Sequence, residues 1–288
     1  MNHYNARMEQ SFDERKASPI YQLKQLNNLL KRAFINEALN KFSSSAEITV
    51  VDLCGGKGGD LKKWLYYCVK NNKKLRYLLV DASNVEVDRA KRRFEELSVK
   101  EKNCVEIAEF MCLDAFQFDT VSKVAELSPF VTQCDIVSCQ FAMHYAFESE
   151  RKSEDFWKVV DWFSAEHSML VLSHPSRQRV IEWCRAHQQA NTKELCEIVF
   201  TDSKVNQMLC NLSLDVAVQQ APQFGACYQF SLQDTLEEVP EFLLPVRSIL
   251  HDQAQKFGNC SCILQTTVDK LFEKNDLCSI LVYPLGVP

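Results

Sequence analysis

The chain has 288 residues, of which 46% are hydrophobic, and its formal net charge is −5. No stretch approaches 18 uninterrupted apolar residues, and the polar N-terminus lacks the apolar core of a signal peptide, so we expect a soluble, unsecreted protein with no membrane partner. Thirteen scattered cysteines form no Cys-x-x-Cys motif. This pattern excludes a readable zinc ribbon or disulfide framework, and we expect reduced thiols and no metal.

The charge is unevenly distributed. Residues 1–103 contain 20 Lys and Arg against 13 Asp and Glu, whereas the remainder contains 13 against 25. A basic first third on an acidic body suits a local anionic ligand better than a long nucleic acid bound along its whole backbone.

Predicted elements alternate along the chain. Residues 1–17 are polar and predict a flexible tail, and residues 18–42 predict an amphipathic helix with Ser18 as its cap and Pro19 just inside. Apolar runs then predict strands, and the segments between them predict helices. The strands are at 48–54, 75–81, 105–114, 134–141 and 168–175; the helices are at 61–70, 84–97, within 115–133, at 150–166 and from Ser176 to 188.

Nearly continuous apolar strands that alternate with helices indicate a parallel sheet covered on both faces. We therefore predict a doubly wound, Rossmann-like α/β fold over residues 18–288 as a single domain. From residue 193 the alternation fails, and the segment 193–257, with ELCEIVF, a polar loop and CYQFSL, is predicted to be an insertion.

The segment VVDLCGGKGGDLKKW, residues 50–64, places four glycines between a strand and a helix. Asp81 and Asp114 end the next two strands and would face the same crevice as these glycines. A nucleoside triphosphate site would need Gly-Lys-Ser/Thr, which is absent, and a dinucleotide site would need a glycine where Leu61 stands. S-adenosylmethionine is therefore the favoured ligand, with Asp81 taking its ribose hydroxyls. The alternative is that both aspartates only cap loops.

A second group of candidate residues follows the fourth strand in CQFAMHYAFES, residues 139–149. One short loop delivers Gln140, Phe141, His144 and Tyr145 to the crevice. A flat purine could stack there, and more strongly if it carries positive charge.

These residues resemble the eukaryotic mRNA cap guanine-N7 methyltransferase family. The segments that carry the resemblance are IYQLKQLNNLLK, DLCGGKGGDLKKW, DIVSCQFAMHYAFES, PQFGACYQFSL and VPEFLLP, and they span about residues 18 to 245. The resemblance implies transfer of a methyl group from S-adenosylmethionine to N7 of the guanine cap of mRNA, a cap-binding role for the insertion, and nuclear residence. Implied partners are 5′-capped RNA and, beyond it, other capping enzymes or the RNA polymerase II machinery.

The resemblance also assigns roles to single residues. Residues expected to contact the cofactor are Lys31 at its carboxylate, Cys54, Gly55 and Gly56 in the loop, Asp81 at the ribose, Asp114 at the adenine end, and Gln140 and Tyr145 on the other side. Residues expected to hold the capped RNA end are Asn27, Asn28, Lys57, Lys63, Arg93, Phe141, His144, Glu241 and Tyr283. No residue is assigned as a general base.

Two departures from the family matter. The family usually has Gly-Cys-Gly where this chain has Cys54-Gly55-Gly56, so a side chain either clashes with the cofactor or points into the sheet. The family's last strand offers a tyrosine where this chain has Leu281, and Tyr283 lies two residues on, on the same face. Two alternatives stay open: a non-catalytic cap-binding or regulatory subunit, and a cap ribose 2′-O-methyltransferase.

Overall fold

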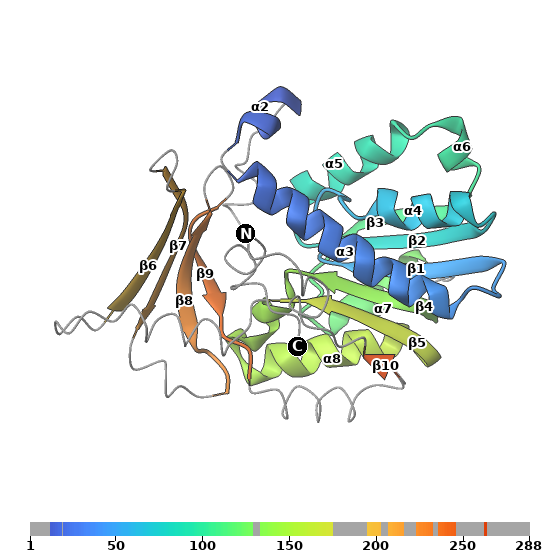
Figure 1. Ribbon diagram of the computed structural model, residues 1–288. Coiled ribbons are helices and arrows are strands. Elements are labelled where there is room, and N and C mark those ends of the chain that lie inside the picture. The colour runs from blue at the N-terminus through green and yellow to red at the C-terminus, as the bar shows by residue number, and fades with distance from the viewer. Residues whose placement is uncertain are drawn as a thin grey trace.

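A six-stranded parallel sheet forms the centre of the protein (Figure 1). The structure is a computed structural model that describes residues 12–18, 20–128, 133–174, 195–202, 207–215, 223–232, 236–245 and 262–263. The strand order is β10-β5-β4-β1-β2-β3, and each pairing is parallel. The strands are β1 (Glu47–Leu53), β2 (Lys74–Asp81), β3 (Val105–Cys112), β4 (Cys134–Gln140), β5 (Ser164–Ser173) and β10 (Cys262–Ile263).

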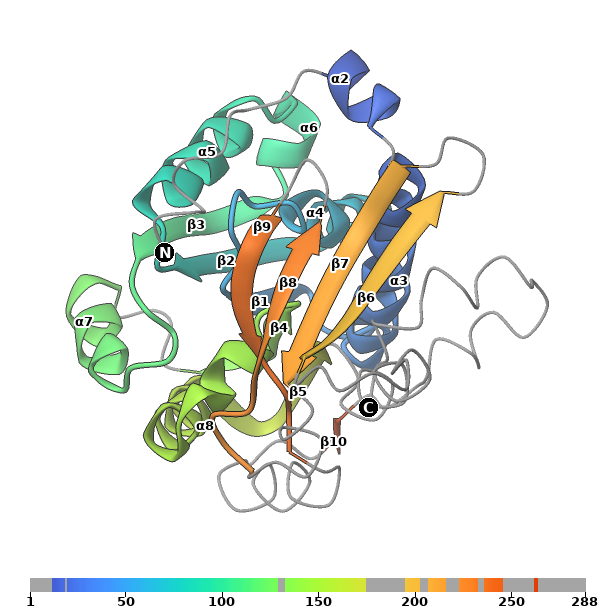
Figure 2. The same ribbon diagram turned by 90° about the vertical axis from the view of Figure 1, so that its left-hand side faces the viewer.

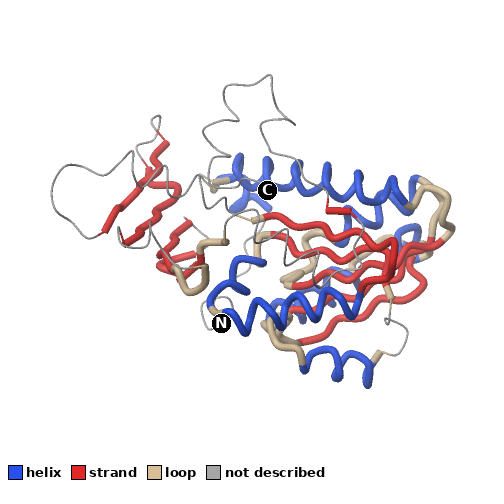
Figure 3. The backbone as a smooth tube through the Cα atoms, turned by 90° about the horizontal axis from the view of Figure 1, so that it is seen from below, coloured by secondary structure: helices blue, strands red, loops and turns tan. Residues whose placement is uncertain are grey.

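Helices cover both faces of this sheet, as the view along its edge in Figure 3 shows. The helices α3 (Tyr21–Lys41), α4 (Leu61–Lys70) and α5 (Asn84–Glu95) lie on one face, and α7 (Asp119–Leu127) and α8 (Glu150–Phe163) lie on the other. Neighbouring residues of β1 point to opposite sides, so Val50 joins the first core cluster and Val51 the second. The predicted doubly wound fold is confirmed.

Two predictions at the N-terminus differ from the structure. Helix α3 begins at Tyr21, and its cap position, Ile20, makes no side-chain hydrogen bond, so the prediction of Ser18 as cap is wrong. The Ser18 carbonyl accepts the Tyr21 N–H instead, which starts the helix through the backbone. Within the predicted flexible tail, residues Phe12–Ala17 form the short helix α2. The flexibility of the remaining tail stays a prediction.

A second, antiparallel sheet has the strand order β6-β7-β8-β9 (Figure 2). It consists of β6 (Leu195–Asp202), β7 (Gln207–Asp215), β8 (Cys227–Leu232) and β9 (Leu236–Phe242). β7 falls where we predicted a polar loop; its sequence QMLCNLSLD alternates apolar and polar residues in part, as a half-solvated strand does. The predicted helix from Ser176 to 188 lies outside the described residues.

The antiparallel sheet meets the parallel one at the 3-10 helix η1 (Met143–Glu148). The Gly225 N–H, just before β8, donates a hydrogen bond to the Phe147 carbonyl at 2.8 Å. β9 also contacts η1. This joint brings the antiparallel sheet to the carboxyl end of β4. None of the helices in the described part of the chain has the length and apolarity needed to cross a membrane.

Candidate functional site

The glycine loop after β1 takes backbone conformations that favour glycine. Gly56 and Gly58 have φ of 52° and 68°, in the left-handed region. A Cβ on Gly55 would lie 2.8 Å from the Leu79 side chain, and one on Gly58 would lie 3.2 Å from the Ala90 Cβ. A Cβ on Gly56 would meet nothing within 4 Å. The loop is thus closely packed beneath and open above, as a ligand lying on the main chain requires.

Cys54 stands at the first position of this loop, where the family has glycine. Its φ is 56°, which is unusual for a residue with a side chain. The side chain packs against the second core cluster, and a hydrogen bond between the thiols of Cys54 and Cys139, together with burial, raises the pKa of Cys54. The side chain therefore points toward β4, the second of the two possibilities that the sequence left open.

Asp81 and Asp114 lie at the carboxyl ends of β2 and β3, on the same side as the loop. Asp81 accepts hydrogen bonds from the Gly56 N–H at 2.8 Å and the Ser83 N–H at 2.9 Å. Burial raises the pKa of Asp81 above its usual value, and the nearby Asp114 carboxylate adds to this shift. The two hydrogen bonds oppose the shift without cancelling it. Asp114 accepts from the Phe116 N–H at 2.9 Å. Both carboxylates are partly exposed and keep lone pairs for a ligand.

Asp60 was assigned no role from the sequence, yet it joins two predicted site residues. Its carboxylate lies 2.8 Å from the Lys31 Nζ and 2.6 Å from the Lys63 Nζ. Lys63 also donates to the Asn28 Oδ1 at 3.0 Å. Burial raises the pKa of Asp60, but the two ammonium groups outweigh burial and lower it overall. The only sequence signal was its position between the glycines and α4.

Asp52 lies beneath this group and is almost fully buried. Tyr77 donates its hydroxyl to the Asp52 Oδ2 at 2.7 Å. Burial and the Asp60 carboxylate raise the pKa of Asp52 to about 7, against the hydrogen bond from Tyr77 and the charge of Lys31. Two carboxylates and two lysines thus form one electrostatic network under the loop.

Phe141 follows β4 with φ of 58°, and the Lys31 Nζ lies 5.2 Å from its ring centre. This cation–π contact joins α3 to the aromatic loop that follows β4. Gln140 is buried and bonded to β5: its amide nitrogen donates to the Val171 carbonyl at 3.0 Å, and its oxygen accepts from Ser173 at 2.8 Å. These bonds fix the start of the loop.

His144 and Glu241 face each other where η1 meets β9. The His144 Nε2 lies 3.6 Å from the Glu241 Oε1, and within the described residues neither ring nitrogen has a hydrogen-bond partner. Burial, and His174 nearby, lower the pKa of His144 to about 3. Burial raises the pKa of Glu241 to about 7, although Tyr228 donates to its Oε2 at 2.6 Å. These buried polar groups have capacity for further hydrogen bonds.

The other predicted site residues lie at varied distances from this centre. The Tyr145 ring is centred 4.3 Å from that of His144, and the Asn27 Oδ1 is buried without a hydrogen-bond partner among the described residues. Lys57 is exposed in the loop. Arg93 lies in the last turn of α5, nine residues from its first, so its backbone is about 14 Å along the helix from the crevice. Tyr283 lies outside the described residues.

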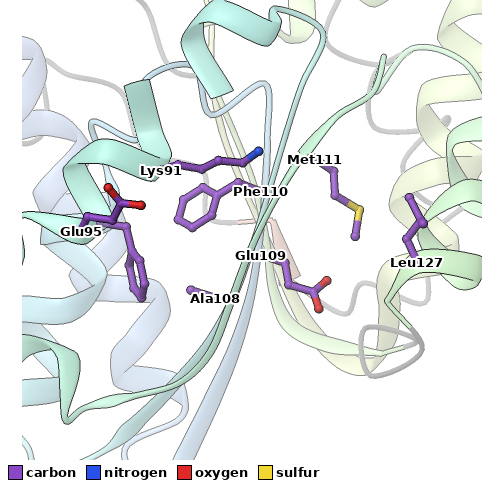
Figure 4. Close-up of a pocket in the computed structure, with 8 residues that line it drawn as sticks. Lys91, Glu95, Ala108, Glu109, Phe110, Met111 and Leu127 are labelled. Atoms are coloured by element: carbon purple, nitrogen blue, oxygen red, sulfur yellow. The ribbon is translucent and has the colours of Figure 1, made fainter. Parts of the chain in front are cut away.

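A hollow of about 470 Å³ lies elsewhere, beside the outermost strand β3 (Figure 4). Its walls come from α5, β3 and Leu127 of α7, and none of the predicted site residues lines it. In the described part of the chain, no three His, Cys, Asp or Glu side chains gather as a metal site would require.

Comparison with known proteins identifies the family. The model of the mRNA (guanine-N(7))-methyltransferase domain matches residues 1–278. The mRNA cap guanine-N(7) methyltransferase of Caenorhabditis elegans is 27% identical over 245 residues, covering 84% of this chain and 59% of that protein. The enzyme of the same name from Schizosaccharomyces pombe is 29% identical over 248 residues, covering 85% and 61%.

The chain thus spans about 60% of the length of these curated relatives. Among solved structures, the PH0226 protein from Pyrococcus horikoshii OT3 aligns with a TM-score of 0.48 at 10% identity, covering 86% of this chain and 90% of that one. Because the family model covers nearly the whole sequence, the chain belongs to the mRNA (guanine-N(7))-methyltransferase domain family.

Proposed function

We propose that this protein transfers a methyl group from S-adenosylmethionine to N7 of the guanine cap at the 5′ end of mRNA. The observation that carries the proposal is the buried pair His144 and Glu241, in which both His144 ring nitrogens lack a hydrogen-bond partner among the described residues. The family named above supports the reaction.

The residues at the loop fit the cofactor. A cradle with open space above Gly56 admits a ligand against the main chain, and Asp81 and Asp114 offer acceptors for ribose hydroxyls and for the adenine end. Lys31, which pairs with Asp60, is the proposed contact for the methionine carboxylate. When bound, S-adenosylmethionine supplies a methyl group already activated by its positively charged sulfur.

The opposite wall fits guanine. A charged Glu241 accepts the hydrogens on guanine N1 and N2, and the hydrogen bond from Tyr228 fixes the orientation of its carboxylate. His144 is neutral at physiological pH because its pKa is about 3, so one ring nitrogen can donate while the other accepts. The Phe141 and Tyr145 rings provide surfaces on which a purine can stack.

Two lysines near the glycine loop are the proposed contacts for the triphosphate bridge of the cap. Lys63 is buried and oriented by Asp60 and Asn28, and Lys57 is exposed in the glycine loop. Phosphate contacts of this kind position the substrate, whereas the contacts of Glu241 specify its base. Arg93 remains a proposed phosphate contact only through its long side chain.

Guanine N7 has an in-plane lone pair and no proton to lose, so the reaction needs no general base. The residues described above contribute by holding the two reactants in line and by excluding water. Such positioning accounts for about 7 to 11 kcal/mol of a reaction barrier. Damage to the site should therefore lower the rate in proportion to misplacement.

One set of assays distinguishes the proposed reaction from the two alternatives, a cap ribose 2′-O-methyltransferase and a non-catalytic cap-binding or regulatory subunit. Labelled S-adenosylmethionine is incubated with GpppA-capped RNA and with uncapped RNA, and the product is digested and analysed by mass. We expect one methyl group on the guanine base of capped RNA alone. A methyl group on ribose would favour the 2′-O-methyltransferase. Absence of cofactor binding by calorimetry would favour the cap-binding subunit; the inward orientation of the Cys54 side chain argues against this reading.

For place and partners, we propose nuclear residence and association with other capping enzymes or the RNA polymerase II machinery. Both proposals are supported only by the family to which the chain belongs. Fractionation of cells that carry a tagged copy of the protein, followed by capture of associated proteins, tests both together.

A further inference from the structure

The outer face of α4 carries an exposed aromatic side chain between two lysines. Tyr66 is 63% exposed, and Lys62 and Lys70 are exposed four residues before and after it. Residues at this spacing lie on one side of a helix. The opposite side of α4 buries Leu61, Trp64 and Leu65 in the core, so the packing of α4 does not require a large side chain at position 66.

The charge around this face is basic. Residues 61–74 contain five lysines and no acidic residue, and three of these lysines, Lys62, Lys70 and Lys74, are exposed. The neighbouring helix α6 (Val99–Lys102) contacts α4 and adds exposed Lys100 and Lys102. Its one acid, Glu101, lies near Lys62, but its carboxylate accepts the Ser98 N–H at 2.9 Å and the Ser98 hydroxyl at 2.6 Å. The face therefore offers positive charge together with an aromatic platform.

This face begins in the first turn of α4, directly after the glycine loop. Lys63, next to Lys62, contacts Asp60, the Gly59 carbonyl and Asn28 at the site. From Lys62 to Lys70 the helix advances about 12 Å away from the glycine loop. Figure 1 shows α4 beside the N-terminal helix α3, on the outside of the sheet. An RNA chain that leaves the crevice past Lys63 would meet Lys62 first and Tyr66 next.

We propose that the α4 face formed by Lys62, Tyr66 and Lys70 binds the single-stranded RNA that follows the cap. One base stacks on Tyr66, and the lysines neutralise flanking phosphates. Exposed aromatics in a basic groove are the general means of holding single strands without reading sequence. An acidic protein segment would use the lysines without requiring an aromatic ring. The inference rests on the proposed function, and it adds a second contact region for the same substrate.

The test compares binding of a fluorescein-labelled, GpppA-capped, unstructured 20-nucleotide RNA with binding of GpppA alone. The variants are Tyr66→Ala, Tyr66→Phe and the pair Lys62→Ala/Lys70→Ala. A matched control, Lys152→Ala/Lys158→Ala, removes the same charge from α8 on the other face of the sheet. Methyl transfer to both substrates is measured in parallel.

We expect Tyr66→Ala to weaken binding of the 20-nucleotide RNA about five- to tenfold, with GpppA binding and transfer to GpppA unchanged. Tyr66→Phe should retain the affinity of the original protein. The double lysine variant should reduce the slope of log affinity against log salt by about 1.4, because each phosphate contact on a single strand contributes about 0.7. The α8 control should change neither quantity.

Several results would overturn the inference. The first is equal affinity of Tyr66→Ala and the original protein for the 20-nucleotide RNA. The second is an equal loss of affinity of Tyr66→Ala for GpppA and for the 20-nucleotide RNA. The third is that polyglutamate displaces the 20-nucleotide RNA equally well from Tyr66→Ala and from the original protein. The binding readout does not require methyl transfer. Absence of transfer to GpppA, combined with Tyr66-dependent RNA binding, would contradict the proposed function and still support this inference.

Discussion

Two walls of the candidate site, one formed by α3 and the glycine loop and the other by η1 and β9, differ in whether their buried charges are paired. On the wall formed by α3 and the glycine loop, Asp60 is paired with Lys31 and Lys63 at 2.8 Å and 2.6 Å. On the wall formed by η1 and β9, Glu241 and His144 are as deeply buried, but their 3.6 Å separation is too long for a good hydrogen bond. The first wall is electrostatically complete before any ligand arrives, and the second is not.

This difference separates the two tasks of the site. A paired wall keeps its geometry at little cost and can hold the reactive groups in fixed positions. An incomplete wall destabilises the free protein, and a ligand that supplies the missing hydrogen bonds relieves that cost. Selectivity for guanine should thus reside in the incomplete wall, and stability in the paired one.

The largest effect is expected from Asp60→Ala. It leaves two ammonium groups without their partner, and loss of one member of a buried pair costs about 3 to 5 kcal/mol of unfolding free energy. Methyl transfer should fall with it, because Lys31 and Lys63 lose their orientation. Chemical denaturation measures the first quantity. The matched control is Asp119→Ala, which breaks the exposed pair with Lys123 and should cost less than about 1 kcal/mol. Equal costs would contradict the paired-wall account.

Glu241→Gln should lower transfer and raise stability above neutral pH. The pKa of Glu241 is about 7 in the folded protein and near 4.5 in the unfolded chain, so the folded state holds more protons between these values. Stability contributed by this residue is therefore lost as pH rises from 4.5 to 7. The variant should gain about 3 kcal/mol relative to the original protein at pH 8 and nothing at pH 4.

The same residue sets the expected pH dependence of activity. Because Glu241 must be charged to accept hydrogens from guanine, transfer at low GpppA should decline as pH falls below about 7. A rate profile of the original protein that is flat from pH 6 to 8 would oppose this assignment.

Asp81→Asn should weaken S-adenosylmethionine binding about tenfold, since a charged acceptor for the ribose hydroxyls becomes a neutral one. The amide retains an acceptor oxygen for only one of the two backbone N–H groups of Gly56 and Ser83, so the unfolding free energy should also fall, by about 1 kcal/mol. Calorimetric titration gives the affinity. Unchanged affinity would remove Asp81 from the cofactor site.

The smallest effect is expected from Cys54→Gly. Glycine adopts the φ of 56° without strain, and relief of this conformation should add about 1 kcal/mol of stability, offset in part by the lost thiol contact with Cys139. Thermal unfolding measures it. Gly55→Ala is the companion variant and should destabilise, because its Cβ would meet Leu79 at 2.8 Å.

The helices, strands and glycine loop that form the paired wall were predictable from sequence because they are local, whereas Lys31 and Lys63 entered only through family resemblance. Alternating apolar strands and helices predict the parallel sheet, and the glycine loop, Asp81 and Asp114 follow from positions at strand ends. The link made by Asp60 was missed, since it joins α3 to α4 across 29 residues. The presence of Cys54 where the family usually has glycine was visible in the sequence. The direction of its side chain could be known only from the backbone conformation.

The incomplete wall was predictable only in part. Glu241 entered through family resemblance, and Tyr228 was not anticipated as its partner. The two residues are opposite one another in the antiparallel β8–β9 pair, so their contact depends on a strand register that a single sequence does not specify. The His144–Glu241 contact likewise depends on how the second sheet meets η1.

The central claim is that Glu241 reads the guanine of the cap. It is tested most directly by comparing transfer to GpppA and to IpppA, in which inosine lacks the N2 amino group, for the original protein and for Glu241→Gln. We predict that kcat/KM of the original protein falls about tenfold with inosine, and that this preference nearly disappears in the variant. An undiminished preference in Glu241→Gln would contradict the claim.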